Sequence, residues 1–195
     1  MIFLRAGPIA RTMPAFCHFA VFYMSTIEVR PATLRDAKAI AQVHTLAVQE
    51  AYRGLLPEDY LRTLKSEERQ TYWREAIEYC EPQVMVALEG DKVVGFVGYD
   101  RSRDPKSRPT TGEIWAIYAA PSHWQQGVGL ALWDAARDGL LEEGCTTATV
   151  WIPLCNERAL RFHEIAGFKR ELSTAKTSLV GGVRIEEIRL KRALH

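Results

Sequence analysis

The chain has 195 residues, enough for one domain with a short appendage. A formal net charge of +1 gives no global basic field for nucleic acid, and 47% hydrophobic residues are typical of a soluble globular protein. The four cysteines are widely spaced and form neither a CxxC pair nor a Cys/His metal spacing, so we expect no bound metal and a reduced, cytoplasmic setting.

The N-terminal residues differ in character from the rest. Residues 13–24 are mostly apolar and follow two arginines, as in a signal peptide, but no A-x-A-like cleavage site comes after them. The run is also too short and too interrupted to span a bilayer, so we expect no membrane partner. We interpret residues 1–24 as an N-terminal extension or an upstream start, with targeting as the alternative, and residues 25–195 as a single domain.

Hydrophobic periodicity and turn signals predict alternating strands and helices. Thr33 followed by Asp36 is typical of a helix start, and Gly167 is typical of a helix end. The basic run 101–108 contains Pro and Ser and is interpreted as a solvated loop. In chain order we expect a strand at 27–30, a helix from 33, a loop and second helix start over 52–60, a polar helix around 67–77, strands at 84–88, 93–99 and 113–119, a helix at 128–141, a strand at 147–151, a helix at 157–166, and a strand pair over 177–190 that turns at Gly181 and Gly182. The order β-α-α-β-β-β-α-β-α-β-β indicates an α/β fold with a mixed sheet.

A glycine-rich turn is the most specific feature of the chain. Gly127 and Gly129 lie where strand 113–119 runs through a short turn into helix 128–141. Backbone N–H groups and the helix dipole favour an anion at such a place, so we expect a phosphate-bearing ligand. No Gly-Lys-Ser/Thr follows the glycines, which argues against a P-loop nucleotide site.

Motifs in sequence order resemble the GNAT superfamily of N-acetyltransferases over roughly residues 27–192. The glycine turn is similar to the family's Gln/Arg-x-x-Gly-x-Gly/Ala, although Trp124 stands at the Gln/Arg position. Residues 156–168 are similar to the family's Asn-x-x-Ala-x-x-Phe-Tyr-x-x-x-Gly-Phe, although His163 stands at the tyrosine. The resemblance implies a mixed, mostly antiparallel central sheet flanked by helices.

The resemblance also implies acetyl-CoA as co-substrate, with its pyrophosphate on the backbone amides of the glycine turn. The pantetheine arm would pair with strand 113–119 and hydrogen-bond Asn156. Trp124 offers one N–H donor and no charge, so a side-chain contact to phosphate is not implied there. The implied cofactor-binding residues are Ile117, Tyr118, Ala119, Gln125, Gln126, Gly127, Val128, Gly129, Leu130 and Asn156.

Two residues are candidates for proton transfer. Glu113 lies fourteen residues before Gly127, where some family members carry a general base, and an ammonium must lose a proton before it attacks a thioester. The alternative is an edge or exposed strand residue paired with an arginine. His163 would be the acid or sulfur ligand, since neutral imidazole still donates one N–H bond. Alternatively it only fills the tyrosine's space, and water or Tyr118 is the acid.

The acceptor side is indicated by Tyr52, Leu55, Tyr60 and Trp115, which suit an amine with an apolar body or its cation, unless they are plain core residues. We expect acetyl transfer to a primary amine, on a small molecule or a peptide, by direct attack in a ternary complex. Nothing beside Cys155 in the sequence looks like an activating base, so a cysteine-linked acyl intermediate is not expected. The alternative is a non-catalytic acyl-CoA-binding module. A homodimer is also compatible with the resemblance.

Overall fold

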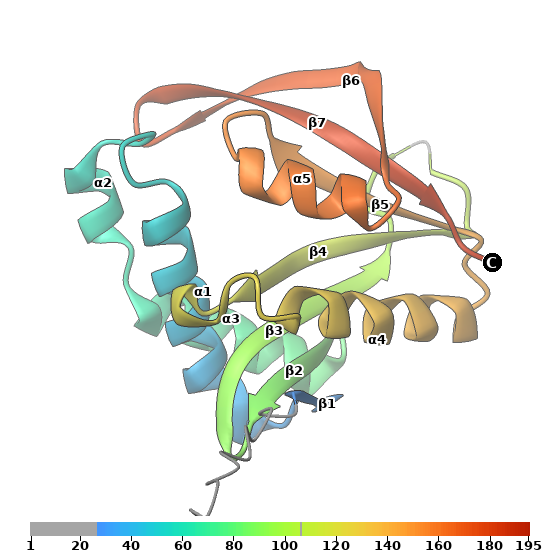
Figure 1. Ribbon diagram of the computed structural model, residues 1–195, viewed down its shortest axis with the longest axis horizontal. Helices are drawn as coiled ribbons and strands as arrows, with labels where there is room; N and C mark the ends of the chain where they lie inside the picture. Colours follow the sequence, from blue (N-terminus) through green and yellow to red (C-terminus); the bar gives the residue numbers. More distant parts are fainter. Residues whose placement is uncertain (1–26, 106) are drawn as a thin grey trace, which may run out of the picture.

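The computed structural model describes residues 27–105 and 107–195, so the predicted N-terminal extension lies outside the described residues. These form a seven-stranded sheet in the order β1-β2-β3-β4-β5-β7-β6, in which only β4 and β5 pair in parallel (Figure 1). This confirms the predicted mixed, mostly antiparallel sheet. The elements are β1 (Ile27–Pro31), η1 (Leu34–Asp36), α1 (Ala37–Ala51), α2 (Glu58–Thr63), α3 (Ser66–Tyr79), β2 (Gln83–Glu89), β3 (Lys92–Arg101), β4 (Thr111–Ala119), η2 (Pro121–His123), α4 (Val128–Glu142), β5 (Thr147–Pro153), α5 (Glu157–Ile165), β6 (Lys169–Val180) and β7 (Val183–Ala193).

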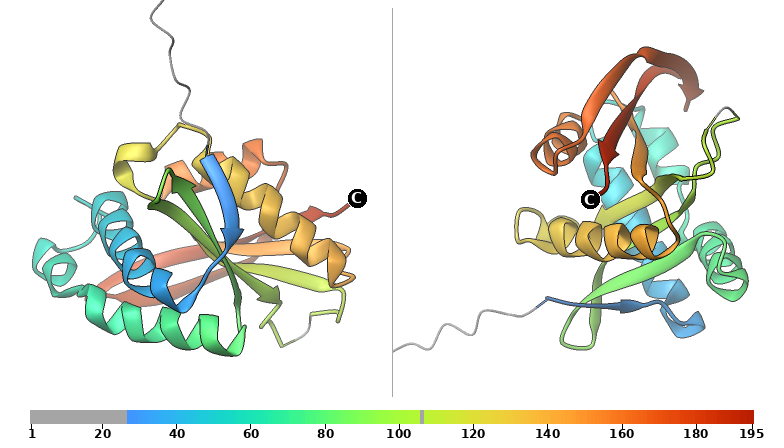
Figure 2. Two further views of the ribbon diagram at one scale, coloured as in Figure 1. Left: turned by 90° about the horizontal axis from the view of Figure 1, so that it is seen from below. Right: turned by 90° about the vertical axis from the view of Figure 1, so that its right-hand side faces the viewer.

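Helices cover both faces of the sheet. Helices α1 and α3 lie on one face, and α4 and α5 lie on the other (Figure 2). Each side has its own buried apolar cluster, one around Trp73 and Phe96 and the other around Leu132 and Trp133. A third, smaller cluster joins the segment from α1 to α2 to the far end of the β6–β7 hairpin.

Local capping explains where the first helical segment begins. The Asp36 carboxylate accepts from the backbone N–H of Thr33 at 2.7 Å and from the Arg30 guanidinium at 2.8 Å. The bond to Arg30 is the main reason why the pKa of Asp36 falls to about 2. The predicted start at Thr33 is therefore confirmed, and it joins the first strand to the first helical turn.

A divergence of two strands is the feature of the sheet that matters most for the site. Strand β4 pairs with β5 only from Thr111 to Ile114, whereas β5 continues to pair with β7 as far as Pro153. The register of β4 on β3 shifts by one residue at Trp115, as in a β-bulge. Beyond that residue, β4 stays on β3 and leaves β5. We call residues 115–119 of β4 and 151–153 of β5 the strand divergence.

The C-terminal hairpin is longer than the sequence predicted. Strand β6 begins at Lys169, well before the expected start at 177. Its pairing with β7 is interrupted between Glu171 and Lys176, and most of its residues are exposed. The early part of β6 therefore lacks the regular alternation that identifies a strand from sequence. The second helix start predicted over 52–60 is confirmed as α2, a short helix separate from α3, which the predicted order β-α-α-β did not count.

Gly139 lets α4 approach the sheet closely. A Cβ atom at this position would overlap the phenol of Tyr99 on β3, which is 3% exposed. Alanine normally stabilises a helix interior by about 1 kcal/mol relative to glycine. We expect Gly139→Ala to lower the free energy of unfolding by about 1–3 kcal/mol instead, because overpacking outweighs helix propensity. Urea titration measures the change.

The neighbouring exposed position gives the matched control, since Asp138→Ala should stay within about 0.5 kcal/mol of the wild type. In a Tyr99→Phe background the penalty of Gly139→Ala should shrink, because the hydroxyl oxygen is the atom nearest to the new Cβ. A gain in stability on Gly139→Ala alone would contradict the close approach.

Candidate active site

The turn before α4 presents free backbone amides. Gly127 has φ +84° and Gln125 has φ +62°, so the chain there is in the left-handed region that glycine adopts readily. The N–H of Ala131 donates to the carbonyl of Gly127 at 3.0 Å. In the described part of the chain, no backbone carbonyl accepts from the amides of residues 125–130. A Cβ at Gly127 would meet no atom within 4 Å, so the space beside the turn is open. These features suit a bound anion.

Trp124 does not aim its N–H at that space. Its indole Nε1 donates to the carbonyl of Ala119 at 2.9 Å, and its ring lies under the guanidinium of Arg158, 3.2 Å from Cζ to the ring centroid. Arg158 comes from α5, across the strand divergence from the turn. The sequence identified Trp124 as a departure from the family pattern but did not identify its partner.

The outer half of β4 has one hydrogen-bonding edge without a strand partner. Residues 116–119 pair with β3, and within the described residues no strand pairs with their other edge. Ile117 and Ala119 pack with the α4-side cluster, while Tyr118 packs with the cluster on the opposite face. The unpaired edge can accept an extended ligand between the two strands, as another strand would.

Glu113 is buried, and both of its carboxylate oxygens accept hydrogen bonds. Its carboxylate, 2% exposed, accepts from Nη2 of Arg103 at 2.6 Å and from the backbone N–H of the same residue at 2.9 Å. The Arg103 guanidinium also lies over the ring of Trp115, with Cζ 3.9 Å from the centroid. The structure therefore contains the arginine pair of the alternative prediction, but Glu113 is buried on the central strand and is neither exposed nor on an edge strand. A proton acceptor role requires this pair to open.

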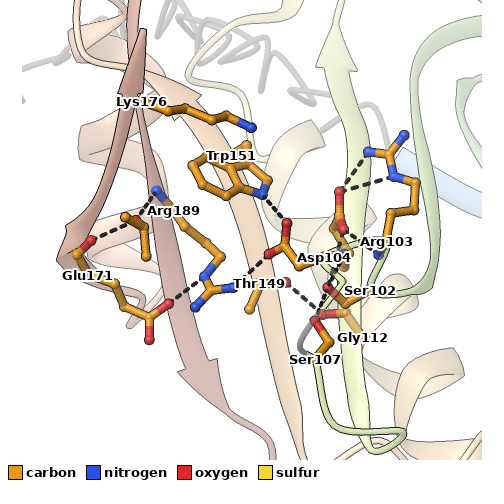
Figure 3. Close-up of polar contacts among 12 residues, drawn as sticks. Ser102, Arg103, Asp104, Ser107, Gly112, Thr149, Trp151, Glu171, Lys176 and Arg189 are labelled. Atoms are coloured by element: carbon orange, nitrogen blue, oxygen red, sulfur yellow. Dashed lines mark hydrogen bonds and ion pairs between the residues drawn. The ribbon is translucent and has the colours of Figure 1, made fainter.

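The β3–β4 loop reaches across to β5 and β7. The Asp104 carboxylate accepts from Nη1 of Arg189 at 2.6 Å and from Nε1 of Trp151 at 3.2 Å (Figure 3). Arg189 is held from its other side by Glu171 at 2.6 Å. The predicted solvated loop is confirmed for Arg103, which is exposed, but the ion pairs of Arg103 with Glu113 and of Asp104 with Arg189 were not predicted. One signal in the sequence pointed to the Arg103–Glu113 pair: a carboxylate on an apolar strand needs a nearby cation.

His163 is enclosed rather than aimed at the divergence. Its ring, 2% exposed, packs edge-on against Phe162 and Phe168, and Nδ1 lies 2.8 Å from the carbonyl of Ala159. A carbonyl only accepts, so the hydrogen of the neutral ring is on Nδ1 and Nε2 has none to donate. Burial lowers the pKa of His163 to about 4. This arrangement fits a histidine that fills the tyrosine's space better than an acid.

Tyr52 lies where α1 ends near the start of α5. Asn156 caps α5 by accepting from the N–H of Ala159 at 3.1 Å, and its side chain also interacts with the Tyr52 hydroxyl. Burial raises the pKa of Tyr52, as it does for nearby Tyr118 and Cys155. A high pKa keeps the phenol protonated at neutral pH, and it keeps the Cys155 thiol from forming a thiolate nucleophile.

The other predicted acceptor-side residues are not gathered in one place. The Tyr60 ring packs against Gly181 at the tip of the β6–β7 hairpin, so it closes one end of the molecule. Leu55 is 42% exposed, and Trp115 lies beneath Arg103. A polar cavity of about 300 Å³ lies between the β3–β4 loop and β5 and β7, with Thr149 and Arg189 in its lining.

Comparisons with known proteins identify the family. The sequence profile of the acetyltransferase (GNAT) family matches residues 55–168. The chain belongs to the GNAT acetyltransferase family. It is 29% identical over 165 residues to YuaI of Bacillus subtilis, an uncharacterized N-acetyltransferase, a match that covers 84% of this chain and 91% of that protein.

Solved GNAT structures share the fold. An N-acetyltransferase from Staphylococcus aureus superposes with a TM-score of 0.70 at 19% identity, covering 88% of this chain and all of that one. YncA from Salmonella typhimurium, solved with its cofactor acetyl-CoA, gives 0.66 at 22% identity, covering 87% and 94%. None of the helices described here is long and apolar enough to cross a membrane.

Acid should destabilise the protein through its buried histidines. Below pH 6.5 the unfolded chain protonates His163, whereas the folded protein does so only near pH 4. Stability is therefore full above pH 6.5 and falls as the pH drops through this window, by about 2 kcal/mol between pH 7 and 5. Burial lowers the pKa of His44 to about 3, which acts in the same direction.

Thermal unfolding of His163→Leu between pH 7 and 5 measures the contribution of this residue. The variant should lose less stability over the range than the wild type does. His195→Leu, at an exposed position, is the matched control and should follow the wild type. An unchanged pH slope in His163→Leu would show that the buried imidazole is not the group responsible.

Proposed function

We propose that the protein transfers an acetyl group from acetyl-CoA to a primary amine by direct attack. The observation that carries this proposal is the free-amide turn at 125–130 beside the open edge of β4. Together they suit a ligand with a phosphate group at one end and an extended amide chain at the other. YncA, which shares the fold, binds acetyl-CoA.

In this proposal the pyrophosphate lies on the amides of Gln125, Gln126, Gly127, Val128, Gly129 and Leu130. The pantetheine arm follows β4 along Ile117, Tyr118 and Ala119 toward Asn156. The amine nitrogen attacks the thioester carbonyl carbon, and backbone N–H groups of β4 stabilise the oxyanion. The C–S bond then breaks and the attacking nitrogen loses a second proton, which the CoA thiolate takes up, so that the products are the amide and the CoA thiol.

Glu113, directly or through water, is proposed to take the proton that the ammonium loses. Its carboxylate lies on β4 next to the start of the strand divergence, and Trp115 beside it offers an aromatic face to a cation. Arg103 now occupies both the carboxylate and the indole. We expect an acceptor cation to bind after the guanidinium swings out, which its 53% exposed side chain permits.

Tyr52 is proposed to donate a hydrogen bond to the leaving sulfur in place of the family tyrosine. It is protonated at neutral pH and lies beside Asn156 at the start of α5, whereas His163 has no free N–H toward the divergence.

The pairing of Glu113 with Arg103 also supports a second candidate function, a non-catalytic acyl-CoA-binding module. In that case the only role of Glu113 is to hold the β3–β4 loop.

The test of the function is CoA release from acetyl-CoA, followed with a thiol reagent, with lysine, tyramine, spermidine and an alanyl peptide as acceptors. We expect amine-dependent release that falls about 100-fold or more in Glu113→Gln, the usual scale for loss of a general base. The amide side chain retains hydrogen-bond acceptance toward Arg103, so the fold should persist.

Asp104→Asn is the matched control, because it weakens the same loop without touching Glu113. Full activity in Glu113→Gln would remove this carboxylate from the mechanism while leaving the enzyme. Acetyl-CoA binding without release by any of the four amines would instead favour the binding module.

Tyr52→Phe should lower kcat about 10- to 100-fold and leave KM for acetyl-CoA nearly unchanged, since the hydroxyl is needed mainly as negative charge develops on sulfur. Steady-state kinetics with the best acceptor measures both constants. Tyr118→Phe is the control on the adjoining strand. If that variant loses kcat and Tyr52→Phe does not, the donor is Tyr118.

A further inference from the structure

We propose that Arg158 is a phosphate-binding residue for coenzyme A, which supplies from α5 the cation that the turn before α4 lacks. This inference rests on the proposed function and extends it, because it assigns a ligand contact to a side chain that matches neither family motif. It also explains how the turn can function with a tryptophan at position 124.

The first argument is geometric. Arg158 and Trp124 come from opposite sides of the strand divergence, one from α5 and one from the turn, and they meet with the guanidinium 3.2 Å from the indole centroid. The contact holds the charge beside residues 125–130, whose amides are free. The indole itself is committed to the Ala119 carbonyl, so it serves as a platform and not as a donor.

The second argument concerns the donors that the stack leaves available. A guanidinium that stacks on an aromatic ring uses its flat face, while its N–H groups point outward in the plane of the group. Those donors match two oxygens of a phosphate. Stacking therefore orients Arg158 and leaves its hydrogen-bonding capacity for an anion.

The third argument is the lack of a competing carboxylate. In the part of the chain that the structure describes, no carboxylate forms an ion pair with Arg158. Glu50, the acidic residue whose charge acts on it, is paired with Arg53 at 2.5 Å. By contrast, Arg103 and Arg189 are each bound to carboxylates at 2.6 Å. Arg158 is thus a cation with its counter-charge still to be supplied.

The test is the Kd of CoA and of pantetheine, which lacks the phosphates, measured by calorimetry on the full chain. Arg158→Ala should raise the Kd of CoA tenfold or more, the scale of a lost charge-assisted hydrogen bond, and leave that of pantetheine unchanged. The loss should be smaller at high salt. Arg161→Ala, an exposed arginine one turn further along α5, is the matched control and should bind CoA as the wild type does.

A relocation variant separates the charge from the structural role. In Trp124→Arg combined with Arg158→Ala, the cation returns on the turn itself, and most of the lost CoA affinity should return with it. Equal losses for CoA and pantetheine, an unchanged Kd in Arg158→Ala, or no recovery in the double variant would each overturn the assignment. A wild type that binds no CoA would instead overturn the proposed function.

Discussion

The departure of β4 from β5 after Ile114 is the constraint on which the rest of the molecule depends. Parallel pairing holds the two strands together for four residues, and the bulge at Trp115 then turns β4 away. The antiparallel pair of β5 with β7 prevents β5 from following. Past Ile114, β4 stays paired with β3 and β5 stays paired with β7, but the edge of β4 that faced β5 has no strand partner. This unpaired edge leads directly to the free amides before α4. Backbone N–H and C=O groups that are buried need a hydrogen-bond partner, and in our proposal the extended arm of acetyl-CoA supplies it along this edge.

Charge crosses the divergence at two places, with different consequences. On the side of α1 and α3, Arg103 and Asp104 join the β3–β4 loop to β4, β5 and β7 through pairs that satisfy both partners. On the side of the turn before α4, Arg158 crosses to the ring of Trp124 and retains its net charge. A satisfied pair must open before its carboxylate can react, whereas an unsatisfied cation attracts an anion at once. In the proposed reaction, this difference favours binding of acetyl-CoA first and of the amine second.

Sequence reasoning recovered the fold because its signals are local. Two apolar runs joined by a turn predicted β2 and β3, and the capping pair at Thr33 and Asp36 predicted the first helical start. The first half of β6 was not predicted for the same reason. Its residues show little alternation of apolar and polar side chains, and it forms a strand because it pairs with β7. The site was predicted only where a motif is contiguous. The partners of Glu113 and Trp124 come from separate segments, and nothing local distinguishes Arg103 or Arg158 from other surface arginines.

The two departures from the family motifs, Trp124 and His163, have a common physical logic. Each removes a polar group that the family pattern offers to the cofactor, and each replacement is then held by the protein itself: the indole N–H by Ala119 and the imidazole N–H by Ala159. Because each of these N–H groups already donates to a backbone carbonyl, neither Trp124 nor His163 can donate it to the cofactor. In our proposals other elements supply these contacts: Tyr52 at the end of α1 donates the hydrogen bond to sulfur, and Arg158 on α5 supplies the cation for phosphate. In these proposals the chemistry of the site is kept, while the residues that perform it lie at other positions of the chain.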